Sequence, residues 1–175
     1  MEIVKVTKAH IPALSELAAV TFIETFGYLF SAEDLQSFIA TYYGHDALAR
    51  AIEDPEGFWR IAFDRDGTAV GYVHVVPVQL PHDSANSDTD GELKRLYIRQ
   101  SHQGQGIGRA LMDTAIAQLD RRFPKGAHWI SVWNRNEKAI ALYQSYGFDK
   151  AGEWTFNVGE APNLMFILRR TDSRR

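Results

Sequence analysis

The first candidate site is a glycine-rich stretch, Q-G-Q-G-I-G, at residues 103–108. Gly104, Gly106 and Gly108 follow an apolar run that is typical of a strand and precede a run with helical spacing. The first turn of a helix has unpaired N–H groups and the positive end of the helix dipole, so it binds phosphate well. Glycine also lets a ligand approach the backbone, because it has no Cβ atom. The stretch therefore predicts a phosphate-binding turn, and a tight turn that needs small residues only for folding is the alternative.

Two common phosphate signatures do not fit this stretch. A P-loop ends in Gly-Lys followed by Ser or Thr, whereas Gly108 is followed by Arg109 and Ala110. The dinucleotide fingerprint has the spacing G-x-G-x-x-G, whereas these glycines have the spacing G-x-G-x-G. Neither of these two ligand classes is therefore indicated.

The elements that position the turn follow from periodicity and turn residues. The expected strands are rich in β-branched and aromatic residues and cover 2–7, 58–63, 69–76, 92–98, 129–132, 153–158 and 163–169. The expected helices have apolar residues at helical spacing and cover 11–26, 31–43, 45–52, 105–121 and 136–146. Thr7 is the expected N-cap of the first helix, Ser31 and Asp34 open the second, and residues 77–91 form a loop.

This order of elements predicts an α/β (α+β) fold in one domain. Strands and helices alternate after residue 92, which favours a central mixed, mainly antiparallel sheet of about seven strands with helices on both faces. The domain is expected to cover residues 1–170, and residues 171–175 are expected to form a frayed tail.

Composition excludes several classes of function. A net charge of −3 and a pI near 6.1 argue against nucleic acid as a main partner. The chain has no cysteine, which rules out thiolate metal sites and a cysteine acyl intermediate, and its six histidines lack metal-ligand spacing. No apolar run approaches membrane-spanning length, and the chain begins directly with the strand-like E-I-V-K-V-T. We therefore expect a cytoplasmic protein with no metal and no membrane partner.

Two motifs resemble the signatures of the GNAT family of N-acetyltransferases. The first is the strand, Q/R-x-x-G-x-G/A turn and amphipathic helix over residues 96–112, and the second is N-x-x-A followed by Y-x-x-x-G-F at residues 136–148. The defining positions are occupied here by Gln103, Gly106, Gly108, Asn136, Ala139, Tyr143, Gly147 and Phe148. The resemblance covers essentially the whole chain. It implies a sheet that splits around acetyl-CoA.

Within the family, the chain is most similar to bacterial PaiA-type spermine/spermidine acetyltransferases. The stretches that carry this likeness are T-F-I-E-T-F at 21–26, E-L-K-R-L-Y-I at 92–98, V-W-N-R-N-E-K-A-I at 132–140 and T-F-N-V-G-E at 155–160. This likeness implies a polyamine acceptor. PaiA-type proteins have also been linked to gene regulation, so a non-catalytic acetyl-CoA-binding regulator stays open, as does a homodimer.

The resemblance also implies which residues bind the cofactor. The turn would hold the pyrophosphate and the preceding strand would pair through its backbone with the pantetheine arm, like an added strand. The residues at the matching positions are Leu96, Tyr97, Ile98, Gln103, Gly104, Gln105, Gly106, Ile107, Gly108, Arg109 and Asn136. A solvated surface arginine is the alternative for Arg109, and an ordinary helix N-cap is the alternative for Asn136.

Two residues are the candidate catalytic groups. Tyr143 lies seven positions after Asn136, so the two share one helix face about 10 Å apart along the axis. In the family, the matching tyrosine gives a proton to the leaving thiolate, and a half-buried packing residue is the alternative. Glu92 is the candidate base that takes the proton of the amine, because family members often have a glutamate near this position. A solvated carboxylate at a strand end is the alternative for Glu92.

The acceptor site is expected near the loop that precedes the active strand. Residues 81–92 carry Asp83, Asp88, Asp90 and Glu92 and no Lys or Arg, so they predict an acidic rim that attracts a polycation. A polar solvated loop is the alternative. Glu24 and the aromatic residues around it, including Tyr28, are expected to line an acceptor tunnel or to serve packing alone. The expected reaction is acetyl transfer from acetyl-CoA to a primary amine, a polyamine in the first place, by direct attack in a ternary complex. A protein N-terminus or another small amine is the alternative acceptor.

Overall fold

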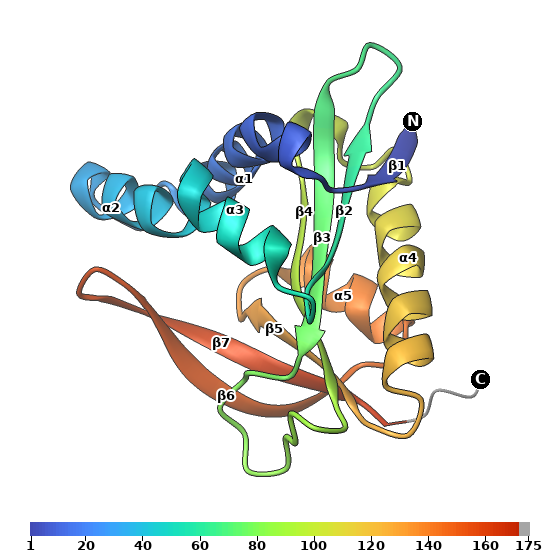
Figure 1. Ribbon diagram of the computed structural model, residues 1–175. Coiled ribbons are helices and arrows are strands. Elements are labelled where there is room, and N and C mark those ends of the chain that lie inside the picture. The colour runs from blue at the N-terminus through green and yellow to red at the C-terminus, as the bar shows by residue number, and fades with distance from the viewer. Residues whose placement is uncertain (172–175) are drawn as a thin grey trace.

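A seven-stranded sheet forms the centre of the molecule in a computed structural model that describes residues 1–171 of the 175 (Figure 1). The strand order is β1-β2-β3-β4-β5-β7-β6, and every neighbouring pair is antiparallel except β4 with β5. The strands are β1 (Glu2–Lys5), β2 (Phe58–Phe63), β3 (Ala69–Pro77), β4 (Gly91–Ile98), β5 (His128–Trp133), β6 (Asp149–Val158) and β7 (Ala161–Arg170). The predicted mixed, mainly antiparallel sheet is confirmed. The expected tail begins at Thr171, and its remaining residues, 172–175, lie outside the described part of the chain.

Helices cover both faces of this sheet, as predicted (Figure 1). The helices are α1 (Ile11–Phe26), α2 (Ala32–Tyr43), α3 (His45–Glu53), α4 (Ile107–Arg122) and α5 (Glu137–Ser145), with short 3₁₀ helices η1 (Lys8–His10) and η2 (Gln100–His102). The first three pack in one apolar core with Trp59, Ile61 and Tyr72, and α4 and α5 pack in another with Val70 and Val73. Side chains of β2 and β3 thus enter cores on opposite faces of the sheet, and β3 is buried along all but its last residue.

Local side chains begin the helices largely as expected. The Ser31 side chain accepts a hydrogen bond from the Asp34 N–H at 3.1 Å at the start of α2. The prediction that Thr7 is the N-cap of the first α-helix was wrong. Thr7 is the N-cap of the 3₁₀ helix η1, and His10 holds the N-cap position of α1.

Strands β4 and β5 pair over a very short distance before they separate. The parallel register joins Gly91, Glu92 and Leu93 to His128, Trp129 and Ile130, and it ends there. Strand β4 continues to Ile98 with only β3 beside it, while β5 continues against β7. From Lys94 onward, one edge of β4 therefore has backbone groups without a neighbouring strand.

A β-bulge marks the point of separation. His74 of β3 pairs with Arg95 and Val75 pairs with Leu93, so Lys94 has no partner in β3. An extra residue shifts the alternation of side chains by one position. Glu92 and Arg95 therefore share one face of β4, although in a regular strand they would face opposite sides. The residues of β4 carry no pattern that predicts this bulge.

The loop between β3 and β4 is anchored by a buried carboxylate at its end. Asp90 is 5% exposed, and its oxygens accept hydrogen bonds from the Trp129 Nε1–H at 2.8 Å and the Ala127 N–H at 3.0 Å. Burial raises the pKa of Asp90, but these bonds and one from the Thr89 hydroxyl outweigh it and leave the pKa below its ordinary value. The carboxylate therefore stabilises the fold above about pH 4, and this stabilisation is lost as the pH falls through the lowered pKa.

Replacing Asp90 with alanine should lower the free energy of unfolding by about 2–4 kcal/mol, because two buried donors lose their acceptor. Denaturant unfolding at neutral pH measures this change. Asp88→Ala is the matched control, since the exposed Asp88 side chain lies two residues earlier, and it should change stability by less than about 0.5 kcal/mol. Equal stabilities for the two variants would contradict the anchoring role.

Candidate active site

Two cavities of about 300 Å³ each meet at strand β4. The first cavity lies where β4 and β5 separate and is lined by Leu96, Tyr97, Ile98, Gln103, Gly104, Gly108, Asn136, Tyr143 and others from β5 and α5. The second cavity lies toward α1, α2 and the β6–β7 hairpin and is lined by Phe22, Phe38, Tyr42, Tyr43, Gln79, Glu92, Trp154 and Phe156 among others. Both cavities share Phe26, Lys94, Arg95, Tyr97, Ser131 and Met165. A molecule in one cavity can therefore reach a molecule in the other.

The glycine turn lies at one end of the first cavity. Gly104 and Gly106 have φ values of 76° and 83°, in the left-handed region that glycine adopts without strain. A Cβ atom at either position would meet no protein atom within 4 Å. The backbone conformation therefore requires these glycines, and the space above them is open to a ligand. Gly106 is also the N-cap of α4, so the unpaired N–H groups of that helix point toward this turn.

The turn and the segment before it are held by hydrogen bonds of their own side chains and by two carboxylates of α1. The Gln103 Nε2–H donates to the Ile98 carbonyl at 3.3 Å, and the Gln105 Nε2–H donates to the Ser101 carbonyl at 3.3 Å. Arg99 forms an ion pair with Glu16 of α1 at 2.7 Å. The Gln100 N–H donates to a carboxylate oxygen of Glu24 at 2.8 Å. Glu24, expected to line an acceptor tunnel, therefore ties α1 to the segment before the turn.

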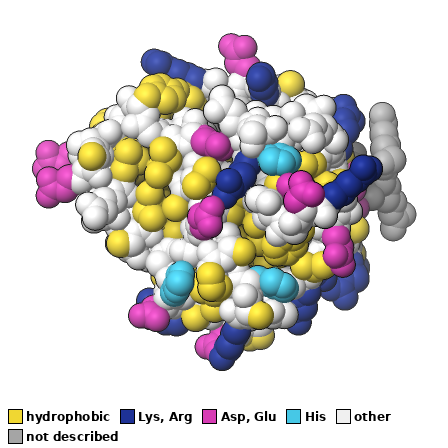
Figure 2. All heavy atoms as spheres, turned by 90° about the horizontal axis from the view of Figure 1, so that it is seen from above, with side chains coloured by type: hydrophobic (Ala, Val, Ile, Leu, Met, Phe, Trp, Pro, Cys, Tyr) yellow, Lys and Arg dark blue, Asp and Glu magenta, His cyan; other side chains and the backbone are white. Residues whose placement is uncertain are grey.

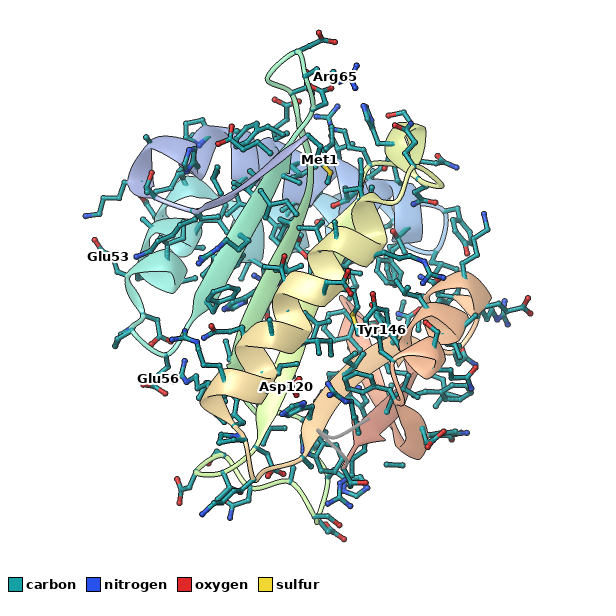
Figure 3. All side chains as sticks on the ribbon, turned by 90° about the vertical axis from the view of Figure 1, so that its right-hand side faces the viewer. Met1, Glu53, Glu56, Arg65, Asp120 and Tyr146 are labelled. Carbon is teal, nitrogen blue, oxygen red and sulfur yellow. The ribbon has the colours of Figure 1, made fainter. Side chains whose placement is uncertain are left out.

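The remaining turn residues divide between the core and solvent. Ile107 is buried in the core under α4, whereas the Arg109 side chain is exposed in the first turn of the same helix. A guanidinium at that place is available to an anion bound at the helix N-terminus. Helix α4 is held to α5 by the Tyr146 hydroxyl, which donates to Asp113 at 2.6 Å (Figure 3).

Asn136 and Tyr143 both line the first cavity, from the start and the end of α5. The Asn136 side chain accepts a hydrogen bond from the Ala139 N–H at 3.1 Å, so it is the N-cap of the helix. Tyr143 is 6% exposed, and burial raises the pKa of its hydroxyl above the ordinary value. The hydroxyl therefore stays protonated at neutral pH, which is the state that a proton donor needs.

Glu92 lines the second cavity, on the other side of β4 from the α4 core. Its side chain is 4% exposed, and one carboxylate oxygen accepts a hydrogen bond from the Gln79 N–H at 2.8 Å. Burial raises the pKa of Glu92, although this hydrogen bond and the charges of Lys94 and Arg95 oppose the shift. A carboxylate with a raised pKa is a stronger base than a solvated one, so Glu92 can take a proton from a molecule in this cavity.

The other predicted acceptor residues lie apart from these cavities. Asp88 lines a separate surface hollow beside Arg122 and Lys125. Asp90 is buried and its carboxylate is occupied by the hydrogen bonds that anchor the loop, so we assign it to the fold. Tyr28 is 71% exposed, and its ring lies 6.2 Å from that of Trp133, which lines the first cavity.

Several residues that line the two cavities were not predicted from the sequence. Lys94 and Arg95 line both cavities because of the bulge, and a bulge has no signature in the sequence of β4 alone. Trp154 and Phe156 line the second cavity because the β6–β7 hairpin reaches beneath α2 (Figure 1). There the ring of Phe156 meets that of Phe38 edge-on, with 5.7 Å between the ring centres. Alternation in a strand marks such residues as packing residues, and it does not indicate which distant helix they meet.

Within residues 1–171, no group of three or more His, Cys, Asp or Glu side chains is arranged to hold a metal ion. No helix in the same range is long and apolar enough to cross a membrane.

Comparisons with known proteins agree with this geometry. A family model described as the acetyltransferase (GNAT) family matches residues 13–148. An uncharacterized N-acetyltransferase in the pepI 3' region of Lactobacillus delbrueckii subsp. lactis is 30% identical over 173 residues, which cover 97% of this chain and 96% of that protein. The spermine/spermidine N(1)-acetyltransferase of Bacillus subtilis is 32% identical over 76 residues, which cover 43% of this chain and 50% of that protein.

A solved structure shares the whole fold. The PaiA N-acetyltransferase of Thermoplasma acidophilum, in complex with coenzyme A, has a TM-score of 0.76 and 20% identity and covers 98% of each chain. The family match, the turn at the N-terminus of α4 and the split between β4 and β5 lead to one conclusion. The protein belongs to the acetyltransferase (GNAT) family and is an acetyl-CoA-dependent N-acetyltransferase.

Proposed function

We propose that the protein transfers the acetyl group of acetyl-CoA to a primary amine of a small molecule, with Glu92 as the base and Tyr143 as the acid. The observation that carries this proposal is the position of the two groups. Glu92 lines one cavity and Tyr143 lines the other, and the cavities meet along Lys94, Arg95 and Tyr97 of the same strand. An amine in the second cavity can therefore attack a thioester in the first.

The first cavity has the features that acetyl-CoA needs. The open left-handed glycines and the first turn of α4 suit a pyrophosphate, and Arg109 can add charge. The free edge of β4 over Leu96–Ile98 suits the amide groups of a pantetheine arm, which can pair with it as an added strand would. When bound, acetyl-CoA supplies an acetyl group whose bond to sulfur breaks as the bond between its carbonyl carbon and the amine nitrogen forms.

The two catalytic side chains then move the protons. An alkylamine is mostly protonated at neutral pH and has no free electron pair until its proton is removed. The Glu92 carboxylate takes this proton, directly or through water, and the raised pKa of Glu92 makes it suited to do so. The Tyr143 hydroxyl gives a proton to the leaving sulfur. The nitrogen loses a second proton as the amide forms, and this proton passes through water to restore the Tyr143 hydroxyl.

Polyamines are the acceptor class that two similar proteins support. The partial likeness to the Bacillus subtilis spermine/spermidine acetyltransferase and the fold shared with a PaiA protein support them. The expected acidic rim does not add support, because Asp88 and Asp90 lie away from the second cavity. At the opposite end of the molecule from the loop that carries them, which Figure 2 shows, acidic and basic side chains are interspersed. The function is tested by measuring acetyl transfer to polyamines, amino acids, simple alkylamines and peptide N-termini, and a non-catalytic regulator would acetylate none of them.

Tyr143→Phe should reduce kcat by about 10²–10⁴-fold and change the Kd of coenzyme A by less than about threefold. The substitution removes the proton donor and keeps the ring that packs in the core. Steady-state kinetics and calorimetry measure the two quantities. Tyr146→Phe is the control, because Tyr146 directly follows the same helix and its hydroxyl bonds to Asp113. Full activity in Tyr143→Phe would return the residue to a packing role.

Gly106→Val should weaken coenzyme A binding at least tenfold, because a β-branched residue is strained at positive φ and its side chain enters the space above the turn. Gly67→Val is a matched control: Gly67 has a φ of 79° and similar open space, but it lies in the β2–β3 turn. Calorimetry with folded protein measures both affinities. If the two variants bind coenzyme A equally well, the turn does not hold the pyrophosphate.

Glu92→Gln should lower kcat by about 10²-fold or more and shift the pH dependence of the remaining activity to higher pH. Without the carboxylate, the free amine has to come from solution, where it becomes abundant only near its own pKa. In the unmodified enzyme, activity should rise with pH through the raised pKa of Glu92, since the base acts only when it is deprotonated. A pH profile of kcat that is the same in both proteins would exclude Glu92 as the base.

A further inference from the structure

The side chain of Arg95 is a half-buried cation at the junction of the two cavities. Its guanidinium lies 5.2 Å from the ring centre of Tyr43 and 5.6 Å from that of Trp59. Within residues 1–171 it makes no hydrogen bond or ion pair with another side chain or with a carbonyl. Arg99, Arg122 and Arg170 differ, because each of them pairs with a carboxylate.

No carboxylate among the described residues forms an ion pair with Arg95, although the charge of Glu92 acts on it from the same face of β4. His74, its cross-strand neighbour, is 5% exposed and stacks on Trp59 at 3.7 Å, and neither ring nitrogen has a hydrogen-bond partner. Burial, with Arg95 and Lys94, lowers the pKa of His74 well below its ordinary value, so the ring is neutral. A partly desolvated cation with unsatisfied polar groups around it is costly unless a ligand completes the cluster.

Charge in the second cavity favours an anion over a second cation. Its charged lining side chains are Glu92, Lys94 and Arg95. Glu92 can accept a proton from an ammonium group, whereas Arg95 would repel any further amine of a polyamine. Lys94 is directed to the side-chain oxygen of Gln79 and adds to the positive charge.

The bulge places the groups that would recognise such a ligand on one face of β4. It makes Glu92 and Arg95 neighbours on that face, and successive residues on one face of a strand are on the order of 7 Å apart along the backbone. From such neighbouring positions both side chains can reach one small ligand that carries an amine and a carboxylate on the same carbon atom. The remaining lining is largely aromatic, with Phe22, Phe38, Tyr42, Trp154 and Phe156. An apolar side chain would fill it.

We propose that the acceptor is an amino acid with an apolar side chain, whose carboxylate binds Arg95 and whose amine faces Glu92. This inference rests on the proposed function, since it names the substrate of the same site. The guanidinium can form a two-pronged contact with a carboxylate, which a simple amine cannot use. The aromatic faces of Tyr43 and Trp59 hold the guanidinium in place for this contact.

The test compares matched pairs of acceptors that differ only in the carboxylate: phenylalanine with phenethylamine, and leucine with isoamylamine, with spermidine alongside. The unmodified enzyme should show a kcat/KM for each amino acid at least about 30-fold above that of its partner amine. Arg95→Gln should remove this preference mainly by raising KM for the amino acids, so that kcat/KM becomes about equal within each pair. Arg95→Lys should keep part of the preference, because it retains the charge and loses the two-pronged geometry.

Controls separate a failure of this inference from a failure of the function. Arg122→Gln removes an arginine that pairs with Glu56 away from both cavities, so it should leave the preference intact. Calorimetric titration of phenylalanine into protein saturated with coenzyme A measures binding without turnover, and Arg95→Gln should abolish it. Equal kcat/KM within each pair, or a preference for spermidine, overturns the amino-acid acceptor and leaves the proposed function standing. If no amine is acetylated but phenylalanine binds in an Arg95-dependent way, the proposed function fails and the binding site stands.

Discussion

The separation of β4 from β5 after three residue pairs is the constraint on which the site depends. A strand inside a sheet normally uses both edges for hydrogen bonds, and unpaired backbone groups away from water are costly. Here the cost is confined to a stretch from Lys94 to Ile98 and to the first turn of α4. The unpaired backbone groups of both segments lie at one cavity. One elongated ligand with amide and phosphate groups can therefore pair with both. We therefore expect the enzyme to bind its cofactor with backbone that the sheet leaves unpaired.

The bulge at Lys94 shapes the second cavity, where the acceptor is proposed to bind. It occurs where the two strands part, and it turns Glu92, Arg95 and Tyr97 to the side of α1 and α2. The β6–β7 hairpin then closes the second cavity with aromatic side chains from below (Figure 1). Glu92 and Tyr143, the proposed proton acceptor and donor, thus line two cavities that meet at one strand. In the proposed reaction, the reacting atoms meet where the backbone of this strand is free.

Local signals made most of the fold predictable. Ser31 and Asn136 begin helices as their side chains predict, and the glycines mark the turn before α4. The cofactor residues from Leu96 to Arg109 form consecutive elements, so a motif in the sequence locates them together in space. The roles assigned to these residues stay predictions, although the structure brings Asn136 and Tyr143 to the same cavity.

The acceptor site could not be predicted in the same way, because its residues come from distant segments. The acidic residues of 81–92 look alike in the sequence, yet Asp90 is buried against Trp129, Asp88 is on another surface and only Glu92 lines a cavity. Their fates depend on the register between β4 and β5 and on one extra residue in β4, which local composition does not encode. Glu24 similarly bonds to Gln100 because α1 crosses the segment before the turn.

Residue-resolved amide hydrogen exchange, with and without coenzyme A, tests the central claim most directly. The account predicts that coenzyme A slows exchange at the amides of 94–98 that do not bond to β3 and at the amides of 104–109. Exchange in the buried strand β3 should stay unchanged. Protection that appears elsewhere, with no change at either of these two segments, would contradict the claim that unpaired backbone binds the cofactor.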